Sequence, residues 1–371
     1  MVTSLSAVLR KSDGPFSIEE VTLEEPRPDE VLVRVVAAGM CHTDMLARLP
    51  ALEALLPAAL GHEGAGVVEA VGSQVEGLAV GDHVVLSFDS CGHCSPCLTG
   101  RPAYCATFEL RNMSGRRVDG STGARLVDGS EVSARWFGQS SFGQYALTTA
   151  RNTVKVPSDV PLELLGPLGC GIQTGAGAVL NEMKPGPGNN LAVFGAGAVG
   201  LAAVMAAKLS GVREIVAVDV HTSRLDLALE LGATRVVNGR DEDVLAQVVG
   251  DTGGLDFTFD TTGVGSVMQV AVQALARPGL CVLVGAGQDE FSIAPTALIG
   301  RHVTFVYEGS AVPQLFIPEL VEHYRNGRFP LDRLVQSYQL ADIDRAEADS
   351  VSGAVVKPVI LIPSPEQQET R

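Results

Sequence analysis

The sequence predicts an α/β protein with two domains, one rich in β-strands and one built on a parallel sheet. The chain has 371 residues, which is more than a single hydrophobic core usually supports. Residues 1 to about 165 contain many short β-like runs broken by Gly, Pro and Asp, such as EVLVRVVAAG and GDHVVLSF. From NLAVFGAGAVG to LCVLVGA, strand-like and helix-like runs then alternate, as they do when helices connect parallel strands.

The composition narrows the class of protein. Hydrophobic residues make up 46% and charged residues 19% of the chain, as in a soluble, well-packed enzyme. The formal net charge of −16 would repel phosphate backbones, so we expect no nucleic-acid partner. No apolar run reaches the roughly 18 residues that span a bilayer, and the opening MVTSLSAVLRKSDG lacks the long apolar stretch of a signal peptide. We therefore expect a cytoplasmic protein that acts on a small molecule and not at a membrane.

Four of the seven cysteines lie in CGHCSPCLTGRPAYC, residues 91–105. The odd number of cysteines and the lack of a secretion signal favour reduced thiols and metal binding over disulfides, and Cys281 alone is typical of a small buried hydrophobe. The spacing C-x2-C-x2-C-x7-C suits a tetrahedral zinc ion, with an iron–sulfur cluster as the alternative. Four thiolates leave no position for a substrate, so this site would be structural, with His93 exposed beside it. The predicted ligands are Cys91, Cys94, Cys97 and Cys105.

Three further stretches, GMCHTD, LGHEGAG and LGCGIQTG, supply two thiols and one imidazole from distant parts of the chain. Cys41, His62 and Cys170 would hold a second zinc ion with one position left open, which is the arrangement of a catalytic site. Asp44 is the candidate carboxylate that orients the imidazole of His62. Glu63 would either lie behind the metal and tune its charge or form a structural salt bridge, and the sequence leaves both open.

A dinucleotide site is predicted by GAGAVG, residues 195–200, which matches G-x-G-x-x-G between the strand NLAVF and a helix of small residues. Gly195 would make the turn, Gly197 would admit the pyrophosphate, and Gly200 would let the helix pack closely on the strand. Asp219, at the end of EIVAVD, should bind the adenosine ribose and repel a 2′-phosphate, so NAD is preferred to NADP. Arg224 tempers this preference, because it would contact either the ribose of NAD or a phosphate.

With both metal motifs and the dinucleotide motif in place, nearly the whole chain resembles the zinc-dependent alcohol dehydrogenases of the medium-chain dehydrogenase/reductase superfamily. MCHTD, LGHEGAG, GRPAYC, FGQSSFGQYAL, LGPLGCGIQTGAGAVLN and EGSAVPQLFIPELV resemble the aryl-alcohol (benzyl alcohol) dehydrogenase branch. The resemblance implies that the cofactor lies between two domains, and it favours zinc over an iron–sulfur cluster in the cysteine lobe. The implied parts are a GroES-like catalytic domain at 1–171 with a structural zinc lobe at 88–110, an inserted Rossmann NAD-binding domain at 172–307, and a return to the catalytic domain at 308–371.

The resemblance also implies roles for single residues. Thr43 stands where the family keeps a Ser or Thr beside the alcohol oxygen, and His42 stands where a basic residue meets the cofactor pyrophosphate. Leu46 replaces the histidine that ends a proton relay in many relatives, so the sequence does not indicate how the proton reaches solvent. The further implied cofactor contacts, at the nicotinamide or the pyrophosphate, are Val284, Ala286 and Lys357.

The implied reaction is the oxidation of a primary alcohol, aryl or allylic, to an aldehyde with hydride transfer to NAD. Two alternatives stay open: a thiol-cofactor-dependent formaldehyde dehydrogenase, and a non-catalytic protein that binds zinc and NAD. Phe88, Trp136 and Phe142 are candidate pocket residues, although each taken alone is more typical of a core. The strand HVTFVYEG would close the parallel sheet and pair with a second copy, which predicts a homodimer or homotetramer.

Overall fold

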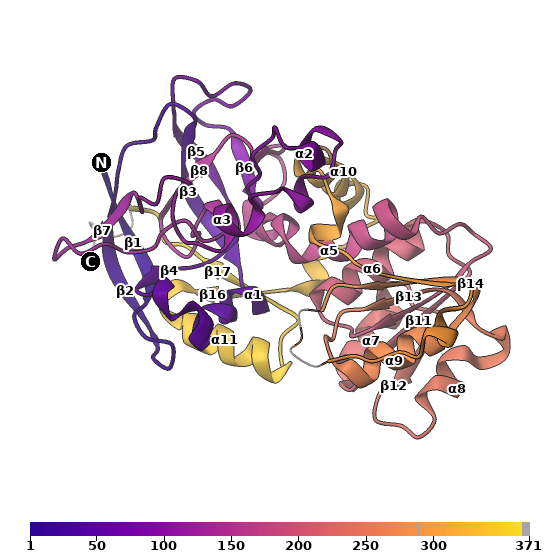
Figure 1. Ribbon diagram of the computed structural model, residues 1–371. Helices are drawn as coiled ribbons and strands as arrows, with labels where there is room; N and C mark the ends of the chain where they lie inside the picture. The colour runs from indigo at the N-terminus through magenta and orange to yellow at the C-terminus, as the bar shows by residue number, and fades with distance from the viewer. Residues whose placement is uncertain (286, 288–289, 366–371) are drawn as a thin grey trace. The chain divides into compact units, whose positions relative to one another are not determined.

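The chain folds into two compact units, shown in Figure 1. The computed structural model describes residues 1–285, 287 and 290–365. The first unit contains Met1–Cys170, Val312–Arg325 and the C-terminal segment from Leu331. The second contains Gly171–Ala311, which includes the predicted Rossmann segment, and Asn326–Pro330. Within the described residues, no helix is long and apolar enough to cross a membrane.

The first unit contains two sheets. The smaller has the strand order β4-β1-β2-β7, and the larger has the order β16-β17-β3-β5-β6-β9, with β8 also paired to β3. The smaller sheet consists of β1 (Val2–Leu9), β2 (Phe16–Leu23), β4 (Ala58–Ala59) and β7 (Ala124–Leu126). The larger consists of β3 (Glu30–Gly39), β5 (Glu63–Val71), β6 (His83–Leu86), β8 (Tyr145–Thr149), β9 (Thr153–Lys155), β16 (Val335–Gln339) and β17 (Lys357–Leu361).

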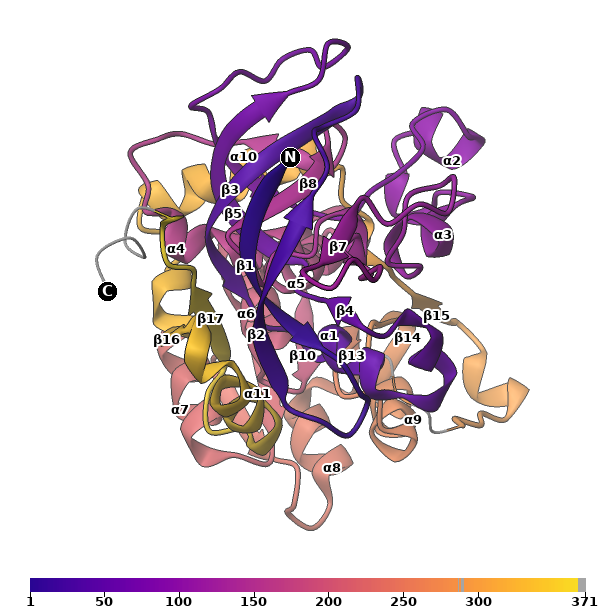
Figure 2. The same cartoon turned by 90° about the vertical axis from the view of Figure 1, so that its left-hand side faces the viewer.

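Strand β17 joins the end of the chain to its beginning. It pairs antiparallel with β3, with Val359 opposite Gly39, and parallel with β16. Figure 2 shows α11 beside β16 and β17, all in yellow. The helices of this unit are α1 (His42–Met45), α2 (Ser95–Leu98), α3 (Phe108–Asn112), α4 (Leu162–Leu165), α10 (Pro313–Arg325) and α11 (Ile343–Ser352).

The core of the first unit lies around β3, whose sequence EVLVRVVAAG is rich in β-branched residues and is buried along most of its length. Phe88, Trp136 and Phe142 belong to this core, and each is at most 2% exposed. Their burial agrees with the core role that each residue type favours.

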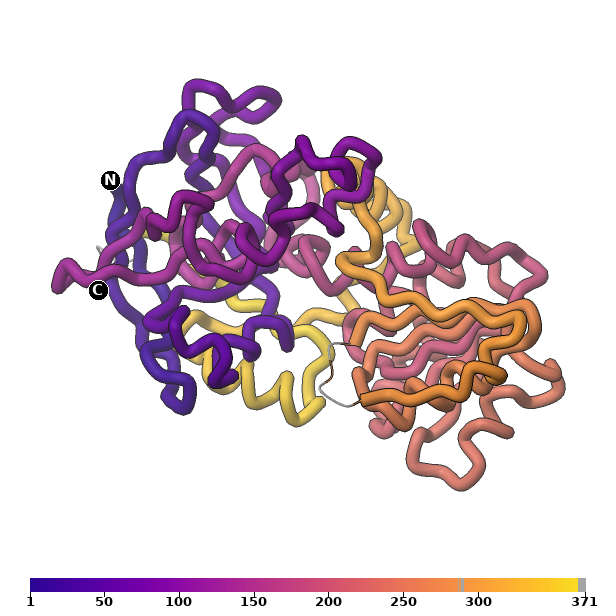
Figure 3. The backbone as a smooth tube through the Cα atoms, in the orientation of Figure 1, coloured from indigo at the N-terminus to yellow at the C-terminus, as the bar shows by residue number. Residues whose placement is uncertain are grey.

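The second unit has a six-stranded parallel sheet in the order β12-β11-β10-β13-β14-β15, and Figure 3 traces its alternation of strand and helix. The chain starts at β10, proceeds outward to β12 and then returns to β13 on the other side of β10, which creates a switch point at the carboxyl ends of β10 and β13. The strands are β10 (Asn190–Phe194), β11 (Glu214–Asp219), β12 (Arg235–Asn238), β13 (Leu255–Asp260), β14 (Leu275–Leu283) and β15 (Arg301–Phe305). The helices are α5 (Gly171–Gly177), α6 (Ala198–Leu209), α7 (Thr222–Leu231), α8 (Val244–Val249) and α9 (Gly265–Gln273).

The predicted α/β class, with a β-rich part and a parallel-sheet part, is therefore confirmed. Cys281 on β14 is fully buried in the core of the second unit, as its sequence context predicts. Burial raises the pKa of its thiol to about 12, so the residue is a neutral hydrophobe at physiological pH.

Candidate metal and dinucleotide sites

The four predicted structural ligands gather in the first unit, and their sulfur atoms lie within 4.8 Å of one another. The Sγ–Sγ distances are 3.4 Å for Cys94–Cys97, 3.9 Å for Cys91–Cys97 and 4.0 Å for Cys94–Cys105. Zinc–sulfur bonds of about 2.3 Å in a tetrahedron would separate the sulfurs by about 3.8 Å, so the cluster fits a zinc ion. All four cysteines are free of disulfides.

The surroundings of these sulfurs favour thiolates that share a cation. The backbone N–H of Ala106 donates to Cys94 Sγ at 3.5 Å and is the main reason that the pKa of this thiol is lowered. Burial raises the pKa of Cys97 to about 12, so four thiolates need a positive ion to be present together. His93 stays exposed and its Nδ1 lies 2.9 Å from the carbonyl oxygen of Cys91, so it is no ligand of the cluster.

Cys41, His62 and Cys170 also meet in the first unit, and Glu63 joins them, with one ligand atom of each within 4.8 Å of the others. Different elements supply them. Cys41 is the N-cap of α1, His62 directly precedes β5, and Cys170 follows the short turn Gly166–Gly169. The Nε2 atom of His62 is buried and has no hydrogen-bond partner. Because such an atom is costly to leave unpaired, the donor set fits a zinc ion.

Asp44 holds the imidazole of His62 from the opposite side. Its Oδ1 lies 2.7 Å from His62 Nδ1 and accepts the N–H of Gly61 at 3.1 Å. Its Oδ2 accepts the N–H of Cys41 at 3.1 Å. This fully buried carboxylate draws the proton to Nδ1 and leaves the lone pair of Nε2 for a metal, the orienting role that the sequence predicts for Asp44.

The charges in this cluster also suit a cation. A hydrogen bond with the thiol of Cys170 is the main reason that the pKa of Cys41 lies well below its usual value. Burial would lower the pKa of His62, but the carboxylate of Asp44 and the thiol of Cys41 together outweigh it and raise that pKa well above the usual value. Without a metal, a proton therefore takes the place on the imidazole that a metal ion would fill.

Lys357 completes the cluster. Its buried Nζ donates to both carboxylate oxygens of Glu63 at 2.9 Å and to the carbonyl oxygen of Met40 at 3.0 Å. Burial would lower the pKa of Lys357, but the carboxylate of Glu63 raises it above the usual value. The pairing of β17 with β3 places Lys357 beside Met40 and close to the predicted metal ligands, and its contact with a pyrophosphate stays a prediction.

Glu63 combines the two roles that the sequence left open: it forms a salt bridge, and it lies beside the three predicted ligands. Its carboxylate is fully buried and crowds the backbone of β3. A Cβ atom at Gly39 would lie 2.0 Å from Glu63 Oε2, so only glycine fits there. Glycine at the end of β3 therefore makes room for the carboxylate beside the metal ligands.

Thr43 and His42 lie on α1 immediately after the predicted ligand Cys41. Thr43 is half-buried, whereas His42 is exposed. Their roles towards an alcohol oxygen and a pyrophosphate stay predictions. Leu46, which replaces the relay histidine, begins the turn that follows α1.

The glycine motif in the second unit has the geometry of a dinucleotide turn. Gly195 has φ +90°, and a Cβ atom on Gly200 would lie 1.8 Å from the carbonyl oxygen of Gly195. By contrast, a Cβ atom on Gly197, the N-cap of α6, would meet nothing within 4 Å. The helix therefore packs tightly on its strand, while the space beside Gly197 and the N-terminus of α6 stays open for a phosphate.

Asp219 ends β11 next to this turn. Its Oδ2 accepts the N–H of Ala196 at 2.7 Å, and its Oδ1 accepts the N–H of His221 at 2.9 Å. Arg224 Nη1 lies 3.9 Å from Asp219 Oδ2, and its buried Nε has no hydrogen-bond partner. Of the two residues predicted to face the adenosine ribose, Asp219 thus lies at the end of β11 and Arg224 lies beside it on α7.

The predicted nicotinamide contacts follow β14. The N–H of Val284 donates to the carbonyl oxygen of Asp260 at the carboxyl end of β13, at 3.0 Å. Ala286 lies outside the described residues.

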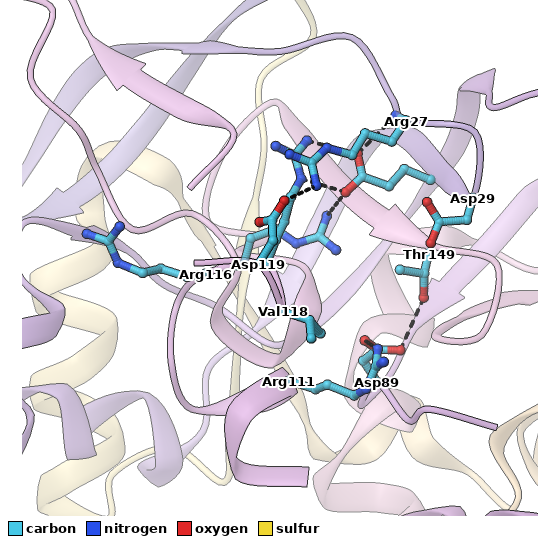
Figure 4. Close-up of a pocket in the computed structure, with 11 residues that line it drawn as sticks. Arg27, Asp29, Asp89, Arg111, Arg116, Val118, Asp119 and Thr149 are labelled. Atoms are coloured by element: carbon cyan, nitrogen blue, oxygen red, sulfur yellow. Dashed lines mark hydrogen bonds and ion pairs between the residues drawn. The ribbon is translucent and has the colours of Figure 1, made fainter. Parts of the chain in front are cut away.

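A separate cavity of about 330 Å³ in the first unit is lined by charged side chains, shown in Figure 4. Arg117 donates to Glu30 at 2.8 and 2.9 Å, and Arg111 donates to Asp89 at 2.9 Å. None of the predicted site residues within the described part of the chain lines this cavity. Its paired charges are typical of a structural network that ties the segment after α3 to the start of β3.

Comparison with known proteins agrees with this geometry. Residues 27–158 match the alcohol dehydrogenase GroES-like domain family, and residues 198–323 match the zinc-binding dehydrogenase family. The geraniol dehydrogenase of Castellaniella defragrans is 42% identical over 97% of this chain and 98% of its own length. The chain belongs to the zinc-dependent medium-chain alcohol dehydrogenases.

Solved structures of this family are closely similar. An alcohol dehydrogenase zinc-binding domain protein from Burkholderia ambifaria has a TM-score of 0.95 at 48% identity, over 98% of this chain and 99% of that one. The benzyl alcohol dehydrogenase of Acinetobacter calcoaceticus has a TM-score of 0.94 at 44% identity, over 98% of this chain and 100% of that one.

The structure of this alcohol dehydrogenase also reveals site residues that sequence reasoning missed. Gln139 Nε2 donates to the carbonyl oxygen of His62 at 2.8 Å, and its Oε1 accepts the N–H of Gly64 at 3.1 Å. The ring of Phe137 stacks on the imidazole of His62. The only signal for either residue is the stretch FGQSSFGQYAL, which carries part of the family resemblance but states no role.

Proposed function

We propose that this alcohol dehydrogenase oxidises aryl or allylic primary alcohols to aldehydes, reversibly, with NAD as the hydride acceptor. The observation that carries the proposal is the buried, unpartnered Nε2 of His62 beside two thiols. The names of two relatives support the substrate class, because geraniol is an allylic primary alcohol and benzyl alcohol is an aryl one.

In this proposal Cys41, His62 and Cys170 hold a catalytic zinc ion, and the four-cysteine lobe holds a second, structural one. When bound, the catalytic zinc supplies a Lewis acid that lowers the pKa of a hydroxyl group from about 16 towards ~7, which corresponds to about 12 kcal/mol. Lys357 balances the charge of Glu63, so this carboxylate does not need the metal as its counter-ion.

Thr43 accepts the proton of the substrate hydroxyl and passes it on, as expected for a hydroxyl group within hydrogen-bond range. NAD, when bound, supplies the nicotinamide that takes the hydride. The turn at Gly195 and Gly197 holds its pyrophosphate, and the carboxylate of Asp219 disfavours the 2′-phosphate of NADP.

The test combines zinc content with NADH absorbance over a panel of aryl, allylic and saturated primary alcohols and both nicotinamide cofactors. We expect two zinc ions per chain, the fastest turnover with aryl or allylic alcohols, and preference for NAD. Cys41→Ala should lose one zinc ion and the activity, whereas Cys281→Ala, which changes a buried thiol outside both clusters, should keep both. Full activity of Cys41→Ala would exclude the proposed metal site.

A second candidate function is the oxidation of a formaldehyde–thiol adduct. It is favoured by the S-(hydroxymethyl)glutathione dehydrogenase of Saccharomyces cerevisiae, which is 31% identical over 97% of this chain and 96% of its own length. Turnover of formaldehyde with glutathione, and none of benzyl alcohol, would select this function. Tight binding of NADH without turnover of either substrate would instead indicate a non-catalytic protein that binds zinc and NAD.

We further propose a cytoplasmic homo-oligomer, a dimer or tetramer, that pairs through β15. This strand ends the described sheet, and two aromatic side chains near its end, Phe305 and Tyr307, are 43% and 51% exposed. A bare sheet edge with exposed aromatic residues favours pairing with a second copy. Light scattering should give a multiple of the 38.7 kDa chain mass, and Phe305→Glu should shift it towards the monomer. The seven free cysteines fit a reducing compartment.

A further inference from the structure

We infer that Phe137 is a positioning residue for the catalytic metal: its ring fixes the plane of the His62 imidazole and so aims Nε2 at the zinc ion. The inference rests on the proposed zinc site at Cys41, His62 and Cys170. It concerns a residue that neither the motifs nor the residue roles implied by the family resemblance single out.

The two rings form a close stack. The centroids of Phe137 and His62 lie 4.5 Å apart with an interplanar angle of 28°. Both side chains are buried, so the surrounding protein limits how far the imidazole can turn. Aromatic pairs in this arrangement contribute more to stability than the burial of their surface area alone would.

The hydrogen bond that His62 Nδ1 donates to Asp44 does not settle the orientation of the imidazole by itself. It fixes one edge of the imidazole, at Nδ1, and the ring can still tilt about that contact. The face contact with Phe137 removes this freedom, because tilting would separate the rings or drive them together. Edge and face together define where the lone pair of Nε2 points, which is the condition for tight, correctly oriented metal binding.

The backbone of Phe137 has an unusual conformation, with φ 49° and ψ 36°. A left-handed conformation is rare for a bulky residue and persists only where the surroundings enforce it. Here the surroundings do so by hydrogen bonds from neighbouring residues. Ser140 Oγ accepts the N–H of Trp136 at 2.9 Å and donates to the carbonyl oxygen of Ala59 at 2.7 Å, and Gln139 holds the carbonyl oxygen of His62.

Two further aromatic rings pack against Phe137. Trp136 packs against it at a centroid distance of 5.4 Å, and Phe108 packs edge-on at 6.3 Å. The N–H of Phe108 donates to the carbonyl oxygen of Cys105, the last cysteine of the four-cysteine cluster. The ring that orients His62 is thus braced by the segment that holds the other metal site.

The test measures how fast a chelator removes each zinc ion, together with the visible spectrum of the cobalt-substituted protein. Phe137→Leu keeps an apolar side chain but loses the ring face. We expect the zinc ion at Cys41, His62 and Cys170 to leave roughly tenfold faster, as for other changes to residues that orient a metal ligand. The zinc ion of the four-cysteine cluster should leave at the same rate as in the wild type and serves as the internal reference. The cobalt spectrum of the fast site should change in intensity, because it reports ligand geometry.

Phe16→Leu is the matched control, since Phe16 is a buried aromatic residue of the same core that packs edge-on against Phe142 and not against a metal ligand. It should lower the unfolding temperature without changing either zinc rate or the cobalt spectrum. If Phe137→Leu does not fold, Phe108→Leu should give a smaller change in the same direction, because it removes the edge-on contact of Phe108 with the Phe137 ring. Unchanged zinc release and spectrum in the folded variant, or equal changes in Phe16→Leu, would overturn the inference. Wild-type protein that binds no zinc at Cys41, His62 and Cys170 would overturn the proposed function instead.

Discussion

Removal of the Lys357 ammonium group should strongly destabilise the first unit. Its Nζ makes three hydrogen bonds of 2.9–3.0 Å, two to Glu63 and one to Met40, and the side chains of Lys357 and Glu63 are 4% and 0% exposed. Lys357→Met would leave the buried carboxylate of Glu63 without its ammonium counter-ion, which costs about 3–5 kcal/mol. For a unit of about 200 residues this lowers the unfolding temperature by roughly 10 °C.

Calorimetry of the zinc-loaded protein at neutral pH measures this effect on the transition of the first unit. The double variant Lys357→Met/Glu63→Gln removes both charges and should recover most of the loss. Glu63→Gln alone should also destabilise, because it leaves the buried ammonium without its counter-ion. A loss below about 1 kcal/mol in Lys357→Met, or a double variant no more stable than Lys357→Met, would show that the pair is not the electrostatic unit that the geometry indicates.

Three further predictions concern other charges. Asp44→Asn should weaken zinc binding at His62 by about 10–100-fold in a chelator competition, because the orienting carboxylate loses its charge, and unchanged affinity would contradict this. Asp219→Ser should lower the KM for NADP relative to that for NAD, with the KM for the alcohol as the control that stays constant. Burial would raise the pKa of Glu30, but Arg117, Arg135 and the N–H of Arg27 together outweigh it and the pKa is lowered. Glu30 therefore stabilises the fold above pH 4.5, and this contribution is lost as the pH falls below that value. The unfolding temperature of Glu30→Gln should therefore change less with acidification than that of the wild type.

Sequence reasoning succeeded where a pattern is local. The cysteines between residues 91 and 105 are close in the chain, so their spacing alone indicates one metal. The glycine motif likewise lies on one strand–turn–helix unit, and the structure gives Gly195 its positive φ and leaves the space beside Gly197 open. The alternation of strand and helix after residue 190 predicted the parallel sheet for the same reason.

The parts that the sequence could not predict depend on contacts between distant segments. Lys357 and Glu63 are separated by 294 positions, and only the pairing of β17 with β3 brings them together. The stack of Phe137 on His62 depends on a left-handed backbone conformation that no hydrophobic period signals. A resemblance to a family transfers residues by position, so it suggested a cofactor contact for Lys357 but gave no sign of the buried ion pair with Glu63.

The charges around the proposed catalytic metal site explain why a lysine at this place would be useful to a dehydrogenase. Four groups near the site carry negative charge when ionised: the thiolates of Cys41 and Cys170 and the carboxylates of Asp44 and Glu63. Zinc contributes two positive charges, and a more negative surrounding makes it a weaker Lewis acid for a hydroxyl group. The ammonium of Lys357 offsets one carboxylate within hydrogen-bond range. The same contact holds Glu63 in an ion pair, so in the proposed site Lys357, from the last described strand, would keep this carboxylate from taking the metal position that a substrate needs.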